Sequence, residues 1–249
     1  MASNYSMKYC VDIVMVIDAT GSMGPLLDTV KTNALNFYGD LMRAMNEKGK
    51  VVHEVRVRVI PYRDFLADGP EAILASDFYT LPQQSREFEE LVRSIQPFGG
   101  GDDPEDGLEA LAYAIKSNWT KDGYKRRHVI IVWTDDGTHA PGFGRNPENG
   151  RDLMKICGIP WDQVRKNAEY YPRKMPSDFD ELTEWWGDEG MPGLMDNNAK
   201  RLILYAPGKE YWTTITDCWN NVIHYEAQAG KGLQELDYQE ILDAIVGSI

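Results

Sequence analysis

The sequence has few cysteines, and they are poorly placed for cross-linking or for metal binding. Cys10, Cys157 and Cys218 are odd in number, far apart and outside any Cys-x-x-Cys spacing. A disulfide framework needs an even set, and a structural zinc site usually needs closely spaced pairs. The cysteine usage therefore argues against both, and it predicts a reducing, cytoplasmic setting.

Positive charge is also scarce. There are 26 Lys and Arg residues against 39 Asp and Glu residues, so the formal net charge is -13. A general nucleic-acid binder needs a basic surface, and Lys125, Arg126 and Arg127 supply only a small basic patch. We therefore expect no nucleic-acid partner. An acidic chain is compatible with cation binding, although solubility alone accounts for the same charge.

No hydrophobic run is long enough to cross a bilayer, which takes about 18 or more apolar residues. The stretch Met1–Lys8 is polar and has no apolar signal core. We therefore expect neither a membrane partner nor secretion. Internal repeats and low-complexity segments are absent as well. A length of 249 residues with 43% hydrophobic side chains fits one globular domain over residues 1–249.

What the sequence does contain is an alternation of apolar strands with amphipathic helices. Continuous apolar runs predict buried strands, and a valine–arginine alternation predicts a half-buried strand nearer an edge. The predicted strands are Cys10–Ile17, Glu54–Ile60, a short edge strand at Ile73–Tyr79, His128–Thr134, Leu202–Tyr205 and Val222–Tyr225. Apolar stripes predict helices at Leu26–Leu41, Phe88–Ile95, Leu108–Ile115 and Leu242–Ile249. This order indicates an α/β fold, a Rossmann-like three-layer α/β/α sandwich whose mainly parallel sheet has one antiparallel edge strand.

Oxygen-bearing side chains gather in three loops of this predicted fold. They are Asp18–Met23, Gly99–Asp106 and Thr134–Gly137. In open parallel sheets, ligands bind beyond the carboxyl ends of the strands, where the strand order reverses. Carboxylates and hydroxyls without soft ligands suit a hard cation, Mg²⁺ or alternatively Mn²⁺ or Ca²⁺. The three loops therefore predict a metal site at that end of the sheet.

The first loop carries a family resemblance. Its alternate residues Asp18, Thr20 and Ser22 can point inward from one tight turn, and Gly21 permits the bend. This pattern after an apolar strand resembles the metal-ion-dependent adhesion site of von Willebrand factor A (vWA) domains. In that family two further loops complete the site, one usually with a Thr and the other with an Asp after a buried strand. Asp135 matches that final Asp.

The middle loop departs from the family pattern. Counting back from Leu108 places Asp102 where the family usually has Thr, as in some bacterial-type members, with Asp103 in reserve. The metal ligands that the resemblance implies are Asp18, Thr20, Ser22, Asp102 and Asp135. A carboxylate at Asp102 would neutralise more of the metal charge, so it would hold the ion more firmly and weaken its pull on an external carboxylate.

Several neighbouring polar residues have a plainer interpretation. Glu105 fits the acidic first turn of a helix, and Asp136 fits a turn. His139 has no second histidine near it in the sequence, so a surface or packing role is expected rather than metal binding. Arg63 and Asp64 are expected to pair with each other.

The link from the third loop to the strand at Leu202 is much longer than one crossover helix needs. It forms an insertion at about residues 138–199 that is rich in aromatic residues. These include Trp161, Tyr170, Tyr171, Trp185 and Trp186. Because the insertion leaves from the metal face, it is expected to form a lid or partner-binding surface, a subdomain with its own small core, or both.

A metal-dependent protein-interaction module is the function that the resemblance implies. A protein partner would supply an acidic residue to the ion, and bacterial members act with separately encoded kinases or phosphatases in stress or defence systems. The alternative is a Mg²⁺-dependent phosphatase-like hydrolase using Asp18. That class resembles an Asp-x-Asp pattern, whereas Thr20 stands at the second position here. Glycine-rich nucleotide loops and a Gly-x-Ser-x-Gly elbow are also absent, so no enzyme activity is expected.

Overall fold

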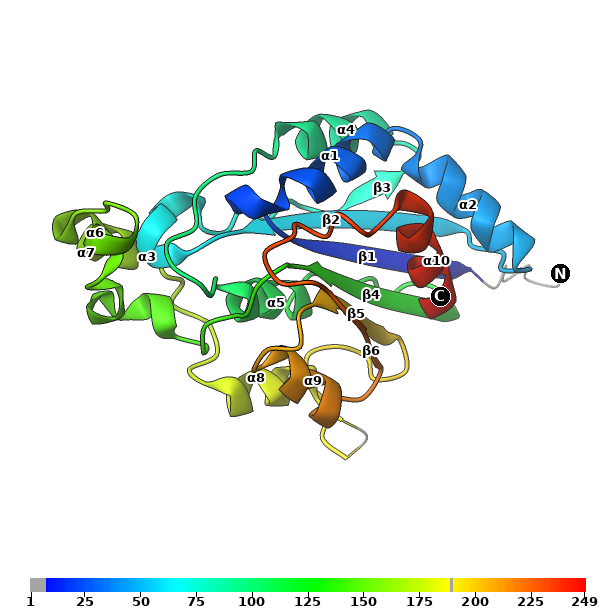
Figure 1. Cartoon of the computed structure of the whole chain (residues 1–249). Coiled ribbons are helices and arrows are strands. Elements are labelled where there is room, and N and C mark those ends of the chain that lie inside the picture. Colours follow the sequence, from blue (N-terminus) through cyan, green and yellow to red (C-terminus); the bar gives the residue numbers. More distant parts are fainter. Residues whose placement is uncertain (1–7, 189) are drawn as a thin grey trace, which may run out of the picture.

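A six-stranded sheet runs through the centre of the molecule (Figure 1). The structure is a computed structural model that describes residues 8–188 and 190–249, so most of the polar N-terminal stretch, residues 1–7, lies outside it. The strands are β1 (Tyr9–Asp18), β2 (Glu54–Tyr62), β3 (Tyr79–Leu81), β4 (Lys125–Trp133), β5 (Lys200–Ala206) and β6 (Val222–Glu226). Their order is β3-β2-β1-β4-β5-β6, and every neighbouring pair is parallel except β2 with β3. The predicted mainly parallel sheet with one antiparallel edge strand is confirmed.

Helices cover both faces of this sheet (Figure 1). They are α1 (Gly24–Asn33), α2 (Phe37–Glu47), α3 (Phe65–Asp68), α4 (Ser85–Ser94), α5 (Gly107–Ile115), α6 (Leu153–Ile156), α7 (Trp161–Ala168), α8 (Phe179–Trp186), α9 (Trp212–Cys218) and α10 (Tyr238–Ser248). Short 3₁₀ helices occur at Gly21–Met23, Gly69–Glu71, Phe143–Arg145 and Pro147–Gly150. Helices α1, α2, α4 and α10 pack on one face, and α5, α8 and α9 pack on the other. The predicted three-layer α/β/α sandwich is confirmed.

Strand β1 shows why the apolar run is continuous. Ile13 and Met15 belong to the core beneath α1, α2, α4 and α10, whereas Val14 and Val16 belong to the core beneath α5. Successive side chains of a strand point to opposite faces, so a strand covered by helices on both sides must be apolar at every position. The result is a rigid central strand that ends at the candidate metal site.

The topology places that end of β1 at a special point. From β1 the chain passes to β2 on one side, and it later adds β4, β5 and β6 on the other side. The direction in which strands are added therefore reverses between β1 and β4. Ligand sites of open α/β sheets lie beyond the carboxyl ends of the two strands at such a reversal.

The predicted helix over Leu26–Leu41 is two helices. A turn at residues 34–36 separates α1 from α2, yet Leu26, Val30, Phe37 and Leu41 are all buried in the same core. The apolar stripe continues across the turn because both helices cover the same face of the sheet. The spacing of the apolar residues therefore predicted the buried face of both helices, but it did not predict the turn between them.

The predicted edge strand Ile73–Tyr79 is wrong in position. Ile73 makes only an isolated bridge to Tyr62, and the antiparallel edge strand is β3, which pairs with residues 55–57. Pro61 explains part of the difference, because the Leu74 N–H donates a 3.1 Å hydrogen bond to the Pro61 carbonyl, but Pro61 has no N–H to complete the pairing.

The segment over residues 138–199 packs in two places. Tyr171, Leu182 and Trp186 join the core beneath α5, α8 and α9. Leu153 and Val164 instead form a small separate cluster with Leu66 of α3. The aromatic-rich segment thus contributes to the main core, and it also builds a small core of its own beside α3.

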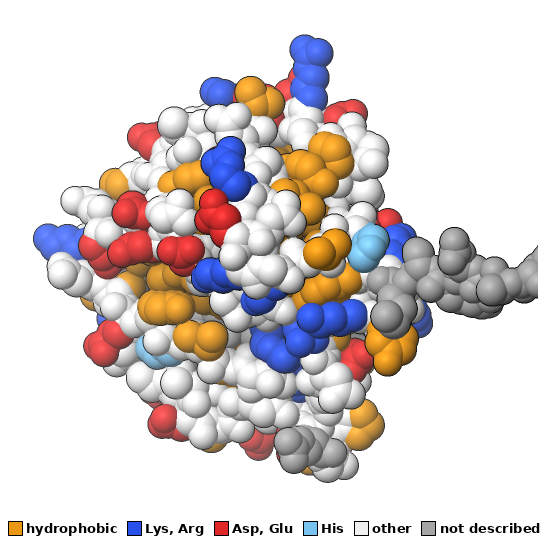
Figure 2. Space-filling view, turned by 90° about the vertical axis from the view of Figure 1, so that its right-hand side faces the viewer, with side chains coloured by type: hydrophobic (Ala, Val, Ile, Leu, Met, Phe, Trp, Pro, Cys, Tyr) orange, Lys and Arg blue, Asp and Glu red, His pale blue; other side chains and the backbone are white. Residues whose placement is uncertain are grey.

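Figure 2 shows the end of the molecule at which β1 and β4 begin, where Lys and Arg side chains gather near the middle. Lys125, Arg126 and Arg127 open β4, at the opposite end of that strand from Asp135. Arg126 pairs with Asp196 at 3.0 Å, so part of this small basic patch is neutralised. In the described part of the chain, no helix is both long and apolar enough to cross a membrane.

Candidate metal centre

Asp18, the last residue of β1, is fully buried and held on both carboxylate oxygens. Its Oδ1 accepts hydrogen bonds from the Thr20 backbone N–H at 3.0 Å and from the Thr20 hydroxyl at 2.6 Å. Its Oδ2 accepts a 2.8 Å hydrogen bond from the Thr134 hydroxyl, which directly follows β4. The ends of the two central strands are therefore joined through this carboxylate.

A second contact joins the same two loops. The Ser22 hydroxyl donates a 2.9 Å hydrogen bond to Asp135 Oδ1, and Asp135 Oδ2 accepts a 2.7 Å hydrogen bond from the Gly232 N–H. Gly232 has φ +60°, and a Cβ there would lie 2.2 Å from the Ser22 carbonyl oxygen, so only glycine fits. The loop after β6 thereby fixes Asp135 beside Ser22.

The middle loop completes an open hollow of about 370 Å³ above these strand ends. Its lining includes Thr20, Ser22, Gly100, Asp102, Asp103 and Glu105. Of the residues predicted to bind metal, Thr20, Ser22 and Asp102 therefore line one cavity. Asp18 and Asp135 lie directly behind it, hydrogen-bonded to Thr20 and Ser22.

Glu105 is the residue that sequence reasoning missed. Its side chain is 6% exposed, and its Oε2 is buried without a hydrogen-bond partner. Gly100 has φ +86°, and a Cβ there would lie 2.5 Å from Glu105 Oε1 and 3.2 Å from a Thr20 methyl group. The carboxyl group is thus enclosed between the first and middle loops. The expectation that Glu105 lies in the first turn of a helix is wrong, because α5 begins only at Gly107 and Glu105 instead forms an isolated bridge with Thr138.

Asp102 and Asp103 both line the hollow but have different neighbours. Asp102 Oδ1 lies 4.0 Å from His139 Nε2. Asp103 lies beside Asp136, whose hydrogen bond raises the pKa of Asp103. Asp136 itself forms an ion pair with Lys209, and it accepts a hydrogen bond from the next residue in a turn. The expectation that Asp136 is a turn residue agrees with these contacts.

The electrostatics of the hollow favour an added positive charge. Burial raises the pKa of Asp18 to about 6; the hydrogen bonds from Thr20 and Thr134 lower it, whereas the nearby Asp135 raises it. Burial, and then the charge of Asp18, raise the pKa of Glu105 to about 11. Carboxyl groups crowded into a buried space resist ionisation unless a cation compensates them.

The donor set also fits a hard cation. A hydroxyl that donates its hydrogen to a carboxylate keeps two acceptor lone pairs, as the Thr20 and Ser22 hydroxyls do here. Such hydroxyls, together with carboxylates, are oxygen ligands of the kind that Mg²⁺, Mn²⁺ and Ca²⁺ prefer. The residues present therefore fit an Mg²⁺-type ion.

The expected pairing of Arg63 with Asp64 is wrong. The Arg63 guanidinium is buried, and it donates to the backbone carbonyls of Phe98, Glu71 and Gln96. Each of the three guanidinium nitrogens thus has a backbone acceptor, while Asp64 Oδ1 accepts hydrogen bonds from the first turn of α3 instead.

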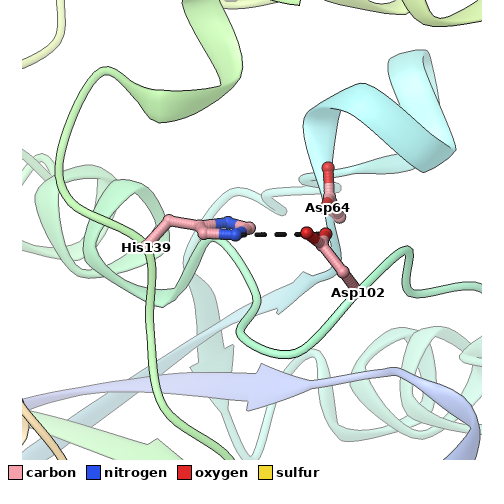
Figure 3. A group of neighbouring side chains, drawn as sticks. All are labelled: Asp64, Asp102 and His139. Atoms are coloured by element: carbon pink, nitrogen blue, oxygen red, sulfur yellow. Dashed lines mark ion pairs between the residues drawn. The ribbon is translucent and has the colours of Figure 1, made fainter. Parts of the chain in front are cut away.

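Asp64 has a different set of neighbours. It caps α3, and it lies close to Asp102 and His139 (Figure 3). Burial, followed by the charges of Asp106 and Asp102, raises the pKa of Asp64 well above its usual range. His139 itself is buried and stacks on Phe143.

Comparison with known proteins supports the fold more than the function. No protein-family model matches the sequence. The alpha-protein kinase vwkA of Dictyostelium discoideum is 26% identical over 169 residues, which are 65% of this chain and 25% of that protein. The chain thus spans about a quarter of the length of this relative.

Solved structures give a similar result. The pilus adhesin SpaC of Lactobacillus rhamnosus GG superposes with a TM-score of 0.52 at 13% identity, over 97% of this chain and 30% of that chain. The vWF domain of the type V pili tip protein Mfa5 of Porphyromonas gingivalis matches 53% of this chain and 39% of that chain, with 23% identity and a TM-score of 0.35. SpaC supports the α/β fold over the whole chain, whereas the Mfa5 likeness is too partial to bear on it.

Proposed function

We propose that this chain is a metal-dependent protein-interaction module of the vWA type, with an Mg²⁺-class ion bound in the hollow. The observation that carries the proposal is the pair of hydrogen bonds that join the loops after β1 and β4. Asp18 with Thr134, and Ser22 with Asp135, hold these loops together around one cavity. The buried, unpartnered oxygen of Glu105 lies between the first and middle loops of the same cavity.

Each ligand has a distinct role in this proposal. The Thr20 and Ser22 hydroxyls face the ion, and Asp18 and Asp135 hold those hydroxyls and contribute negative charge directly or through water. Glu105 is the middle-loop carboxylate that we assign to this ion, because its buried Oε2 has no hydrogen-bond partner and its side chain lines the same hollow as Thr20. Asp102, which the family resemblance implies, lines the same hollow and is the second candidate.

A partner has an evident place to bind. The hollow is open, and Ile156 of α6 forms part of its lining although the side chain is 56% exposed. Met154 on the same helix is 57% exposed. An acidic side chain of a partner would fill the open coordination position, and the apolar α6 surface would pack against its neighbours. Apolar contacts around a desolvated charged anchor are typical of interface centres.

The phosphatase alternative fits these contacts less well. A nucleophilic Asp18 would have to reach a substrate, but this carboxylate is fully buried and both of its oxygens accept hydrogen bonds. Thr20 donates to it, where an acid would be needed to protonate the leaving group. The described geometry therefore favours binding over hydrolysis, and the proposal is that the chain is not an enzyme.

The wider setting is part of the same proposal. A relative whose name is alpha-protein kinase vwkA is consistent with action beside a kinase. We extend this to a separately encoded kinase or phosphatase partner in a bacterial stress or defence system. Cys10, Cys157 and Cys218 are all free, which is compatible with a cytoplasmic location.

The test combines metal binding with partner capture. Calorimetry with Mg²⁺ and Mn²⁺ should show one ion per hollow, and Asp18→Asn should abolish it. A pull-down from the native cell should recover a partner with Mg²⁺ and lose it with a chelator or with Asp18→Asn. Asp28→Asn, at an exposed position on α1, is the matched control and should behave as the unchanged protein. A partner retained equally with and without metal would contradict the proposal.

A further inference from the structure

A second group of metal-binding atoms lies beside the hollow. Asp64, Asp102 and His139 each offer one ligand atom, and the three atoms lie within 4.8 Å of one another (Figure 3). The residues come from the N-cap of α3, the middle loop and the loop after β4. They include an imidazole, so this group differs in chemistry from the all-oxygen hollow.

The imidazole is already oriented for a metal. His139 Nδ1 lies 3.2 Å from Asp106 Oδ1, and the ring is stacked on Phe143 with centroids 3.6 Å apart and planes at 8°. Asp106 is in turn fixed by a 2.7 Å hydrogen bond from the Phe65 N–H to its Oδ2. When Nδ1 donates to a carboxylate, the proton sits on that nitrogen, and the lone pair of Nε2 is free to bind. The Nε2 atom faces Asp102 (Figure 3).

One carboxylate oxygen of Asp64 has no hydrogen-bond partner. Its Oδ1 caps α3 by accepting from the backbone N–H groups of Leu66 at 2.6 Å and Ala67 at 3.1 Å. Its Oδ2 is buried without a hydrogen-bond partner, in a residue with no exposed surface. A Cβ on Gly101 would lie 3.0 Å from this Oδ2, so the free oxygen faces the loop that carries Asp102. Buried polar atoms normally have partners, and this one points to a ligand.

No basic side chain compensates these carboxylates. Over residues 8–188 and 190–249, the ion pairs of Asp102 and Asp106 are with His139 alone, and Asp64 forms none. Arg63, the neighbour of Asp64 in the chain, is engaged by backbone carbonyls. The cluster therefore combines an oriented nitrogen lone pair, an orphaned oxygen and an uncompensated negative charge.

We propose that Asp64, Asp102 and His139 form a second metal site, for a Zn²⁺-class transition ion, next to the Mg²⁺-type hollow. Imidazole nitrogen suits Zn²⁺, which also accepts carboxylates, whereas Mg²⁺ prefers oxygen ligands and keeps much of its water. Three protein ligands leave one tetrahedral position open, as in zinc sites that bind water or an external ligand. The site shares Asp102 with the lining of the hollow, but Asp64 and His139 belong to it alone. It does not depend on the proposed function, in which Glu105 is the assigned middle-loop ligand.

The geometry needs only a small adjustment. Ligand atoms around tetrahedral zinc lie about 3.4 Å apart, given zinc–ligand distances of roughly 2.1 Å. Asp102 Oδ1 and His139 Nε2 are 4.0 Å apart, and the three ligand atoms spread no further than 4.8 Å. Asp102 follows three consecutive glycines and is partly exposed. A rotation of its side chain and a shift of its loop can bring the ligands together.

The experiment titrates the full chain with Zn²⁺ alone, in the presence of saturating Mg²⁺. We expect one Zn²⁺ per chain, and X-ray absorption at the zinc edge should show one imidazole among oxygen ligands. His139→Gln and Asp102→Asn should each weaken Zn²⁺ binding at least about tenfold. Asp102→Asn lies on a partly exposed loop, so it tests the site even if His139→Gln impairs folding. His53→Gln, at an exposed histidine elsewhere, should have no effect.

Asp18→Asn separates this inference from the proposed function. It should remove Mg²⁺ binding and leave Zn²⁺ binding unchanged. Loss of Zn²⁺ binding in Asp18→Asn but not in His139→Gln would place the zinc in the first hollow and overturn the inference. The inference would also be overturned if the protein without substitutions bound no Zn²⁺. It would be overturned as well if the variants at His139 and Asp102 bound Zn²⁺ as tightly as that protein.

Discussion

The Ser22 hydroxyl donates a 2.9 Å hydrogen bond to Asp135, across 113 positions of the sequence. This bond ties the helical turn after β1 to the loop after β4. Because β1 and β4 are adjacent and parallel, their carboxyl ends meet at the same edge of the sheet. The bond leaves the hydroxyl lone pairs free, so the contact that joins the two loops is compatible with the ligand role that we propose for Ser22.

Removing that hydroxyl should weaken metal binding more than it weakens the fold. Ser22→Ala is expected to lower Mg²⁺ affinity about tenfold or more, because it removes a ligand and releases Asp135. Ser22 is exposed, so the melting temperature of the metal-free protein should change little. Calorimetry and thermal melts measure the two effects. Ser94→Ala, whose hydroxyl donates only within its own helix, is the control, and equal losses of affinity in both variants would contradict the assignment.

Stability and metal affinity should depend on pH in opposite directions. The pKa of Asp18 is raised by burial from about 3.8 to about 6, so the folded state holds its proton more tightly than the unfolded state. The stabilisation is complete below about pH 4, and it is lost as pH rises through about 6, at a cost of the order of 3 kcal/mol. Mg²⁺ requires the ionised form, so its affinity should rise over the same range.

Thermal unfolding with and without Mg²⁺ at several pH values measures both trends. Asp18→Asn is the control, since it removes this titration and should flatten that part of the profile. A metal-free protein whose stability rises steadily from pH 4 to 6, with no difference between the two proteins, would show that Asp18 is not the group responsible.

Glu105 should release a proton when the ion binds. Burial and the charge of Asp18 raise the pKa of Glu105 to about 11, so its carboxyl group is protonated at pH 7 in the metal-free protein. An entering cation favours the ionised form. Calorimetry in two buffers of different ionisation enthalpy should show about one proton released per Mg²⁺. Glu105→Gln should abolish that release and weaken binding, whereas Glu148→Gln, at an exposed position, should do neither. Undiminished release in Glu105→Gln would exclude this role.

The sheet and the first loop were predictable because their signals are local. A strand buried on both faces, such as β1, must be apolar at every position. In the loop that follows β1, every second residue carries a side-chain oxygen. Parallel topology then brings Asp18 and Asp135 to one edge without any knowledge of contacts. The place of these residues in the fold therefore follows from short sequence patterns and from the parallel topology.

Glu105 and His139 could not be recognised in this way. Glu105 lies in the loop just before α5, and it is buried because the left-handed turn at Gly100 folds that loop back over it. His139 is a lone histidine in the sequence, and its partners Asp106 and Asp64 lie 33 and 75 positions away. Tertiary contacts alone define their surroundings.

The aromatic-rich segment should contribute to stability through Trp186. Its side chain is 1% exposed and stacks on Trp219, with ring centroids 5.2 Å apart. Trp186→Ala should lower the free energy of unfolding by about 3–5 kcal/mol. Tyr170→Ala, at a side chain that is 55% exposed, should change it by less than about 0.5 kcal/mol. Denaturant unfolding measures both, and similar small effects would show that Trp186 does not hold the segment to the core.

Partner binding, in contrast, should depend on the exposed surface of α6. Ile156 lines the hollow and is 56% exposed, so Ile156→Asp places a charge beside the ion without disturbing the core. Partner affinity should fall by about 2 kcal/mol or more, because the new carboxylate opposes the acidic group of a partner and removes an apolar contact. Mg²⁺ affinity should stay the same or rise, because the added negative charge favours a cation, and the melting temperature should stay nearly unchanged. Leu35→Asp, a substitution at a side chain that is 55% exposed between α1 and α2, controls for added charge. If both variants retain full partner binding while a chelator still abolishes it, the partner contacts the ion from a side of the hollow away from α6.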